Sequence, residues 1–368
     1  MRLAYVCADH GIPLRGDKGA SVHLRSLAGA LAARGHSVTV LARNLNGVNG
    51  DPPSVHVAEL PWRVDEHGRF FEERLAQLLP DVVLERYSLD SGPAMRVSRA
   101  LGIDYALEVN APLVAEAVQF RRLPEDANHQ ARERELFVSA GTVFAVSTAL
   151  RDHIVACGAD ASRVHVVHNG VDVAQFNAAD GSGVRKKYGL DGAVVVGFAG
   201  SLRAWHGVAR LLWAARALPA EYSLLIVGGG NERHLALELA RALGIGDRVV
   251  VTGEVNHSEV ASHLAAMDVA VAPYEAVAGF YFSPLKVMEY MAAGLAIVAS
   301  REGDIPDVID GCGVLVEPGD ERELAAAISR VGGDPELRAR LSQASRERAH
   351  AYSWARVAST VEAVLAPR

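Results

Sequence analysis

The chain has 368 residues, half of them hydrophobic, so it can form two ordinary domains with buried cores. Charged residues make up 22%, which together with this hydrophobic content argues against global disorder. A net charge of −7 at pH 7 argues against a nucleic acid partner, because no basic excess remains to neutralise phosphates along a duplex.

The three cysteines, Cys7, Cys157 and Cys312, are far apart and odd in number, which fits a reducing cytoplasm and shows no metal-ligand spacing. The first residues predict a strand and not a signal peptide, because their apolar run is short. No apolar run approaches the roughly 20 residues needed to span a bilayer. We therefore expect a cytoplasmic protein. Peripheral contact with the inner face of a membrane stays open, and the oligomeric state is unknown.

Strands and helices alternate along the first half. A strand at 3–8, a loop at 9–20, a helix capped by Ser21 and ended by Gly35, and a strand at 38–42 form a βαβ unit. Such a unit requires a parallel sheet with a right-handed crossover. Further strands are expected at 55–59, 81–85, 105–109, 142–146 and 164–167, and helical segments at 70–79, 116–137 and 147–157.

The loop at 9–20 follows the first strand and holds Gly11, Gly16 and Gly19 together with Arg15 and Lys18. Open α/β sheets bind ligands at the carboxyl ends of their strands, so this loop is a candidate site. It has no GxGxxG dinucleotide motif, and a mobile surface loop is an equally good interpretation.

Polar residues also follow the later strands of this half. Arg86 ends one strand, and Glu108 and Asn110 end the next, so we expect them at the same edge of the sheet. Arg86 would either bind a ligand or form a buried ion pair, and Glu108 is as consistent with a structural role. His23, on the first amphipathic helix, is interpreted as a surface or packing residue.

The second half repeats the pattern after a turn-rich stretch, 168–172, that opens a weakly structured segment to about residue 192. The alternation predicts an α/β protein with mostly parallel sheets and a ligand cleft between its halves. The predicted domains are 1–172 with the C-terminal helix 353–368, and 173–352. The expected strands are 194–198, 224–227, 249–252, 269–272, 296–300 and 313–316; the helices are 208–218, 232–243, 257–266 with an Asn256/Glu259 capping box, and those beginning after Asp320, Asp334 and Ser353.

The segment 280–294 carries the strongest local signal. Ser283 and Pro284 predict an N-cap and first position of a helix at about 284–293, ended by Gly294. Lys286 in the first turn opposes the helix dipole, which an anion docked on the free N–H groups would offset. Glu289 lies one turn deeper. The pair suits a ligand with phosphates and sugar hydroxyls; the alternative is a solvent-facing ion pair worth about 0.2–0.5 kcal/mol.

Several motifs occur in an order that resembles the family 4 glycosyltransferases, retaining enzymes of the GT-B fold. They are a Gly-rich loop before the helix ending AARGHSVTVL, HNGVD with Phe176 behind it, GFAGSLRAWHG, EYMAAGLAIVAS and a late YSW. The resemblance runs from the first strand to the last helix. It implies two Rossmann-like domains facing a cleft, with the acceptor bound by the first domain, the donor by the second, and the C-terminal helix crossing back.

The resemblance also implies roles for residues. Glu289 is expected to hold the donor ribose, whereas Tyr281 stands where relatives carry the first of two glutamates. Ser201 and His206 stand at the usual arginine and lysine positions. The candidate catalytic residues are Arg203, Lys286 and Asn110, the last as a donor-sugar contact; the donor-binding candidates are Gly16, Gly19, Ser201, His206, Glu254, Tyr281, Phe282, Ser283, Pro284, Leu285 and Glu289; the acceptor-binding candidates are Lys18, Arg86 and Glu108.

The expected activity is retaining transfer of a sugar from a nucleotide-diphosphate sugar, such as a UDP- or GDP-sugar, to a hydroxyl acceptor. A glycan, a lipid carrier and a small aglycone are all open as acceptors. No metal and no cofactor are expected, because cations and N–H dipoles are placed to stabilise the leaving diphosphate. The alternatives are a GT-B nucleotide-sugar epimerase and a catalytically inactive nucleotide-sugar-binding homologue.

Overall fold

The computed structural model describes residues 1–120, 127–277 and 279–366. The chain divides into two units. Unit 1 comprises Met1–Gly170, Tyr281–Ser283 and Trp354–Arg368, and unit 2 comprises Val171–Phe280 and Pro284–Ser353. Each unit is built on a parallel sheet with helices, which confirms the predicted α/β architecture of two Rossmann-like domains.

The sheet of unit 1 has seven strands in the described residues, in the order β3-β2-β1-β4-β5-β6-β7. All neighbours are parallel, and β1 lies between β2 and β4 with Leu3 opposite Val38 and Val82. Nearly every residue of β1 and β4 is buried, as expected for strands covered on both faces. The strands are β1 (Arg2–Cys7), β2 (Ser37–Ala42), β3 (Val55–Glu59), β4 (Val82–Arg86), β5 (Asp104–Val109), β6 (Thr142–Ala145) and β7 (Val164–Val166).

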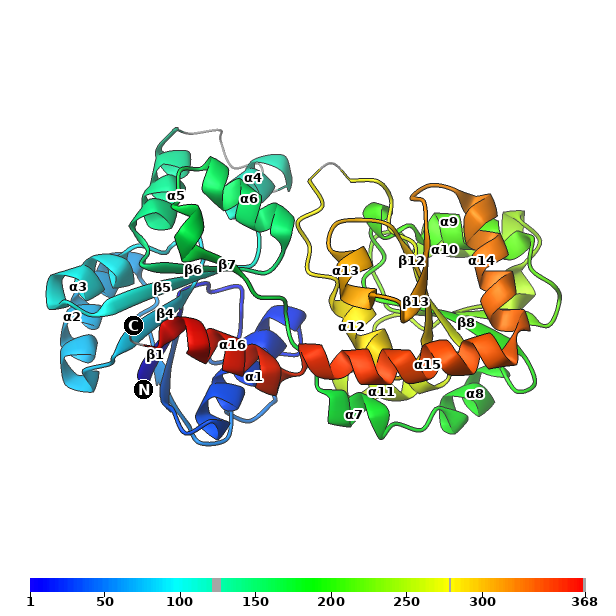
Figure 1. Ribbon diagram of the computed structural model, residues 1–368, viewed down its shortest axis with the longest axis horizontal. Helices are drawn as coiled ribbons and strands as arrows, with labels where there is room; N and C mark the ends of the chain where they lie inside the picture. Colours follow the sequence, from blue (N-terminus) through cyan, green and yellow to red (C-terminus); the bar gives the residue numbers. More distant parts are fainter. Residues whose placement is uncertain (121–126, 278, 367–368) are drawn as a thin grey trace. The chain divides into compact units, whose positions relative to one another are not determined.

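The C-terminal helix α16 completes unit 1 by packing along α1, as Figure 1 shows in red and dark blue. Val357, Ala358 and Val361 of α16 join the same core as Leu24 and Leu27 of α1. The helices of unit 1 are α1 (Gly19–Ala33), α2 (His67–Leu78), α3 (Pro93–Leu101), α4 (Leu113–Phe120), α5 (Ala127–Ser139), α6 (Thr148–Ala156) and α16 (Trp354–Leu365).

The sheet of unit 2 contains, within the described ranges, six parallel strands in the order β10-β9-β8-β11-β12-β13. The chain order therefore reverses between β8 and β11, which makes this pair the topological switch point of the sheet, where ligands of open α/β folds bind. The strands are β8 (Val194–Ala199), β9 (Tyr222–Val227), β10 (Val249–Val251), β11 (Val269–Ala272), β12 (Ala296–Ser300) and β13 (Gly313–Val316).

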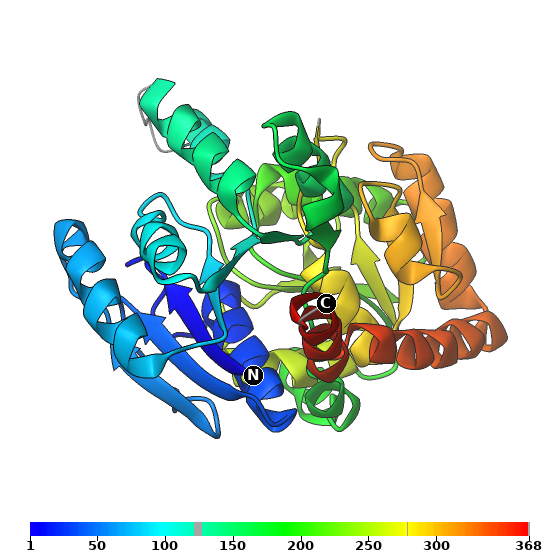
Figure 2. The same cartoon turned by 60° about the vertical axis from the view of Figure 1, so that its left-hand side comes forward.

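Helices cover both faces of the unit 2 sheet, and α15 lies along α12 and β12 (Figures 1 and 2). Leu324, Ile328 and Val331 of α14 bury their side chains in the core with Leu211 and Leu212 of α9. The helices are α7 (Val173–Asn177), α8 (Ser182–Tyr188), α9 (Val208–Arg216), α10 (Arg233–Ala242), α11 (His257–Ala265), α12 (Leu285–Ala292), α13 (Ile305–Ile309), α14 (Glu321–Gly333) and α15 (Pro335–Ala349).

Some local predictions were wrong. Helix α1 begins at Gly19 and not after a Ser21 cap; Ser21 is buried inside its first turn. The segment expected to be weakly structured up to residue 192 contains α7 and α8, each too short for a clear periodic signal. The helical stretch 116–137 comprises parts of α4 and α5, with residues 121–126 outside the described residues. The Asn256/Glu259 capping box and the left-handed Gly294 are confirmed.

Tyr290 bridges the switch point. Strands β8 and β11 pair only at Val196 and Gly197, so they separate before their carboxyl ends. The buried Tyr290 hydroxyl of α12 accepts the Ala199 N–H at 2.8 Å and lies 3.4 Å from the Val271 carbonyl oxygen. One phenol thus contacts backbone groups of both β8 and β11 where these strands have separated, and it fixes α12 against the sheet.

Tyr290→Phe should lower the free energy of unfolding by about 1–3 kcal/mol, because the buried Ala199 N–H loses its acceptor. Urea unfolding of the full chain measures the change. Tyr188→Phe, which removes a hydroxyl from a partly exposed ring on α8, is the matched control and should change little. Equal stability of the two variants would contradict the bridging role.

Candidate functional site

Two glycine-containing loops meet at the carboxyl edge of the unit 2 sheet. Leu202 N–H donates to the Gly229 carbonyl at 2.7 Å, so the loops after β8 and β9 lie backbone against backbone. Gly228 and Gly230 have φ angles of 137° and 140°. A Cβ at Gly228 would lie 2.0 Å from the Gly200 oxygen, so no side chain fits there. This packing forms a smooth backbone surface beside the switch point.

Lys286, in the first turn of α12, faces this surface. Its side chain is only 8% exposed, and Nζ lies 3.3 Å from where a Cβ on Gly200 would stand. The ammonium lies over the rings of Phe198 and Tyr274, 4.2 Å and 4.7 Å from their centroids. Among the described residues no hydrogen-bond acceptor reaches Nζ. The alternative of a solvent-facing lysine was wrong.

Burial lowers the pKa of Lys286 from 10.5 to about 7, with Glu289 opposing the shift. The change corresponds to roughly 5 kcal/mol of unfavourable free energy for the charged form. Burial likewise raises the pKa of Glu289 to about 7, with Lys286 opposing. Both groups are therefore poised to change charge near neutral pH, and an anion at Nζ would favour the ammonium.

The loop after β8 carries the other predicted phosphate contacts. Ser201 and Arg203 are exposed, and the Arg203 guanidinium lies 5.7 Å from the Trp205 ring centroid. His206 Nδ1 contacts the Ser201 carbonyl oxygen. Burial, together with Lys286 and Arg203 and against the Ser201 hydrogen bond, lowers the pKa of His206 to about 4. His206 is thus neutral at pH 7, so the buried positive charge at this edge is that of Lys286 in its protonated form.

Glu254 and Leu285 border the same edge. The exposed Glu254 side chain passes Gly229, where a Cβ would lie 2.8 Å from Cγ. Helix α12 begins at Leu285 with Pro284 as its N-cap residue, and no side chain caps it. The predicted Ser283 cap was wrong, because the Ser283 hydroxyl instead accepts the Asn169 N–H at 3.3 Å. The start of α12 is left without an internal side-chain acceptor.

Tyr281, Phe282 and Ser283 belong to unit 1, whereas Lys286 and Glu289 belong to unit 2. The Tyr281 hydroxyl donates to Glu116 on α4, and the Tyr281 carbonyl accepts from the Ser147 hydroxyl at 2.7 Å. The Tyr281 and Phe282 rings lie 4.3 Å apart. Tyr281 is therefore anchored by hydrogen bonds within unit 1, and its correspondence to the first glutamate of the family motif stays a prediction.

A second constellation lies at the carboxyl edge of the unit 1 sheet, centred on Glu108. His23 Nε2 lies 2.7 Å from its Oε1, and Arg86 donates to the same oxygen at 3.0 Å. Asn110 also donates to Oε1, and the Tyr5 hydroxyl donates to Oε2. Arg86 thus forms the buried ion pair that was one of its two predicted alternatives. Asn110 has Glu108 as its structural partner.

His23 is the residue that sequence reasoning missed. It is buried, its Nδ1 lies 2.7 Å from the Asn169 oxygen, and its ring meets Trp354 edge-on at 5.1 Å. It therefore joins α1, β5 and the first residue of α16. No local pattern identifies it, because its partners lie 85 to 331 positions away, although Asn169 and Trp354 both fall in motifs that the sequence singles out.

Burial alone would raise the pKa of Glu108, but His23, Arg86 and Asn110 outweigh that effect and hold it well below its usual value. Glu108 is therefore a carboxylate at every ordinary pH. Its negative charge is compensated inside the unit, so it is not free to act as an acid.

The remaining candidates lie in the loop before α1. Lys18 and Gly19 are exposed, with Lys18 as the N-cap residue of α1. Gly16 is held by its carbonyl, which accepts from Arg25, and a Cβ there would lie 2.7 Å from Pro13. Arg15 is paired with Asp51 at 2.8 Å. The loop is therefore folded on itself, with Lys18 as its exposed cation.

Family models match both units. Residues 18–175 match the model described as Glycosyltransferase Family 4, and residues 193–334 match Glycosyl transferases group 1. Together these ranges cover well over half of the chain. The two parallel-sheet units are the GT-B fold class of glycosyltransferases. The chain belongs to the family 4-like, group 1 glycosyltransferases.

Two curated relatives show how far the likeness extends. The chain is 30% identical over 243 residues to a D-inositol 3-phosphate glycosyltransferase of Xylanimonas cellulosilytica, covering 62% of this chain and 57% of the relative. It is 35% identical over 208 residues to an MMP alpha-(1->4)-mannosyltransferase of Mycolicibacterium hassiacum. This match covers 55% of this chain and 48% of the relative. The matches thus span about half the length of these relatives.

Among solved structures, Anabaena HepE in complex with UDP and glucose superposes with a TM-score of 0.76 at 19% identity, covering 99% of each chain. At that identity the likeness establishes a shared fold. Within the described part of the chain, no helix combines the length and the apolar character that crossing a bilayer requires.

Glu108→Gln should lower the free energy of unfolding by about 3–5 kcal/mol at pH 7, because Arg86 loses its buried counter-charge. The folded-state pKa of Glu108 lies below its unfolded value, so its stabilisation is complete above the unfolded pKa and is lost as the pH falls below it. Urea unfolding of the full chain from about pH 7 down to pH 3 measures both effects.

The exposed Glu72→Gln on α2 is the control, and it should follow the wild type at every pH. A Glu108→Gln variant as stable as this control would show that the network around Glu108 contributes nothing to the fold.

Proposed function

We propose that the protein transfers a sugar from a nucleoside diphosphate sugar to a hydroxyl acceptor. The observation that carries the proposal is Lys286, whose buried ammonium has no hydrogen-bond acceptor in the described residues and faces the Gly200 backbone. An uncompensated buried cation is costly, and an anionic ligand offsets that cost. A diphosphate complements the Lys286 ammonium in charge and in hydrogen-bonding capacity.

The surroundings of Lys286 support the same ligand. The start of α12 offers backbone N–H groups, which favour phosphate oxygens. Glu289 is one helical turn further along, where a carboxylate can accept from ribose hydroxyls. The HepE structure of the same fold holds UDP and glucose, and the relatives are named as glycosyltransferases. Both findings support the proposal that the donor is a nucleotide sugar.

For the chemical step we propose departure of the diphosphate and attack of the acceptor on the same face of the sugar, which retains the anomeric configuration. The C–O bond to the diphosphate breaks, the acceptor oxygen bonds to the anomeric carbon, and the leaving phosphate takes the acceptor proton. Lys286, Arg203 and the α12 amides stabilise the growing negative charge, and such electrostatic stabilisation supplies much of the rate enhancement in many enzymes. This step uses no metal ion.

The acceptor is assigned only as a hydroxyl compound. The names of the relatives make D-inositol 3-phosphate a first compound to assay, beside glycans, lipid carriers and small aglycones. Lys18, exposed at the start of α1, is the proposed contact for a negatively charged acceptor.

Lys286→Met should separate binding from stability. Methionine fills a similar apolar volume, so the ligand-free variant should be as stable as the wild type or more stable by about 1–4 kcal/mol. Stabilisation by UDP or GDP, measured as a rise in melting temperature, should disappear because the buried ammonium is gone.

Lys186→Met, which removes an exposed lysine on α8, is the matched control and should keep the full nucleotide response. If Lys286→Met lost stability and still responded to nucleotide, Lys286 would be a structural residue.

The pH dependence of donor binding tests whether Lys286 is protonated when the donor is bound. The pKa of Lys286 is about 7 in the free protein, and an anion raises it, so binding takes up a proton above that pH. Affinity for a nucleotide sugar should fall as the pH rises above about 7, since a diphosphate diester keeps its charge there. Titration calorimetry in buffers of different ionisation enthalpy measures the proton uptake; its absence in the wild type would contradict the assignment.

Glu289→Ala should reduce donor turnover by tenfold or more through loss of the ribose contact, whereas Glu347→Ala, an exposed site on α15, should not. Product analysis uses a panel of nucleotide sugars with and without acceptors. A transferred sugar with retained configuration supports the proposal. Free epimerised donor formed without acceptor would identify an epimerase, and tight binding with no turnover would identify an inactive binding protein.

A further inference from the structure

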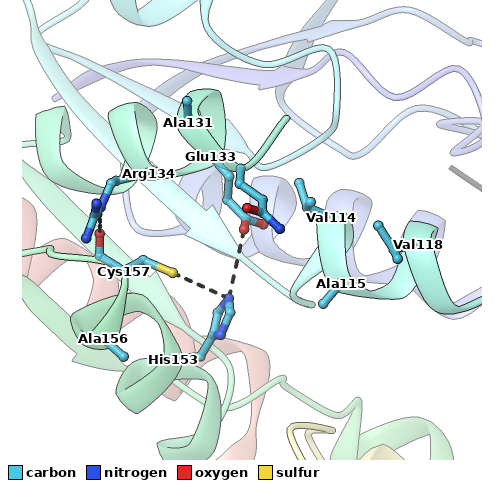
Figure 3. Close-up of a pocket in the computed structure, with 10 residues that line it drawn as sticks. Val114, Ala115, Val118, Ala131, Glu133, Arg134, His153, Ala156 and Cys157 are labelled. Carbon is cyan, nitrogen blue, oxygen red and sulfur yellow. Dashed lines mark hydrogen bonds and ion pairs between the residues drawn. The ribbon is translucent and has the colours of Figure 1, made fainter. Parts of the chain in front are cut away.

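Unit 1 contains a cavity that none of the candidate site residues described above lines. It has a volume of about 690 Å³ and lies among α4, α5 and α6 (Figure 3). One wall is apolar, formed by Val114, Ala115 and Val118 of α4. The opposite wall carries Glu133 of α5 and His153 and Cys157 of α6 and its end. The cavity therefore combines an apolar side with three side chains that can ligate a metal.

The three donor atoms converge. Glu133 Oε2 lies 4.0 Å from His153 Nε2, and Cys157 Sγ lies 3.8 Å from the same nitrogen (Figure 3). All three donor atoms lie within 4.8 Å of one another. Tetrahedral zinc with bonds of about 2.0–2.3 Å requires ligand atoms roughly 3.3–3.7 Å apart. Shifts of about 1 Å or less would therefore complete a coordination shell.

The geometry distinguishes a metal site from a catalytic relay. In a Cys–His–acid relay the carboxylate holds one ring nitrogen and the thiol faces the other. Here Glu133 and Cys157 both face Nε2 of His153. Three donor atoms clustered within 4.8 Å, with the carboxylate and the thiol both on the side of the same ring nitrogen, is an arrangement that suits ligands around an ion.

The surroundings hold these donors in place. The Tyr87 hydroxyl donates to Glu133 Oε1 at 2.8 Å, which leaves Oε2 directed at His153. Arg134 Nε donates to the Cys157 carbonyl at 2.7 Å and fixes the end of α6. Glu133 is buried, whereas His153 is partly exposed, so an ion has a route of entry. Such outer hydrogen bonds orient ligands in known metal sites.

We propose that Glu133, His153 and Cys157 bind a zinc-type divalent cation. A thiolate, an imidazole and a carboxylate together suit zinc or cobalt and disfavour magnesium and calcium, which prefer oxygen ligands. With three protein ligands, the fourth position faces the cavity and its apolar wall, where a water or a ligand atom can bind. The site is separate from Lys286 and Glu289, so it stands or falls independently of the proposed transferase activity.

Cobalt titration of the reduced, metal-free full chain tests the site. One equivalent of Co²⁺ should give visible bands of tetrahedral cobalt and a near-ultraviolet thiolate-to-cobalt band, both displaced by Zn²⁺. Cys157→Ser should abolish the thiolate band, and His153→Ala should weaken binding more than tenfold. Tyr87→Phe keeps all three ligands and should weaken binding by about 10–100-fold, since it only releases the Glu133 carboxylate.

Cys312→Ala, which removes a buried thiol of unit 2, is the matched control and should leave the cobalt spectrum unchanged. Melting curves without metal confirm that each variant is folded. A wild-type spectrum without a thiolate band, or binding that survives both Cys157→Ser and His153→Ala, would overturn the proposal. Loss of the band in Cys312→Ala alone would place the metal elsewhere.

Discussion

The close contact between the loops after β8 and β9 is the constraint on which the unit 2 site depends. Because Gly228 and Gly200 meet backbone to backbone, no side chain fills the carboxyl edge of the sheet at that point. The space beside Gly200 is taken by the end of the Lys286 side chain, whose ammonium lies over the rings of Phe198 and Tyr274. Burial disfavours the ammonium there and an anionic partner favours it, which is how the fold and the proposed ligand chemistry are linked.

The sequence was sufficient to predict the architecture, because apolar strand patterns and helix caps are both local signals. Apolar strands such as 194–198 and helices with caps such as Asn256 carry their own signals, and their alternation implies parallel sheets. The ordered motifs predicted the GT-B fold. Lys286 and Glu289 were predicted as ligand-binding residues from their positions on one helix. These inferences need only spacing along the chain.

The partners of buried polar groups were beyond the sequence, because they come from distant elements. Ser283 is a residue type that commonly caps helices, yet its hydroxyl accepts a hydrogen bond from the Asn169 N–H. Asn110 is predicted as a sugar contact, and its amide donates to Glu108. The cysteine spacing gives no sign of a metal site, although His153 lies one helical turn before Cys157; the third donor, Glu133, lies on another helix. The roles of these residues in substrate binding stay predictions.

The docking of α16 against α1 has a consequence for how the protein is made. The core of unit 1 requires Val357, Ala358 and Val361, which follow every strand of unit 2 along the chain and are therefore synthesised after them. Until then the apolar face of α1 lacks its cover, while all strands of unit 2 have already been synthesised. Unit 1 therefore cannot complete its core until unit 2 has been synthesised, and nascent or truncated chains that lack α16 expose a hydrophobic stripe on α1 to chaperones.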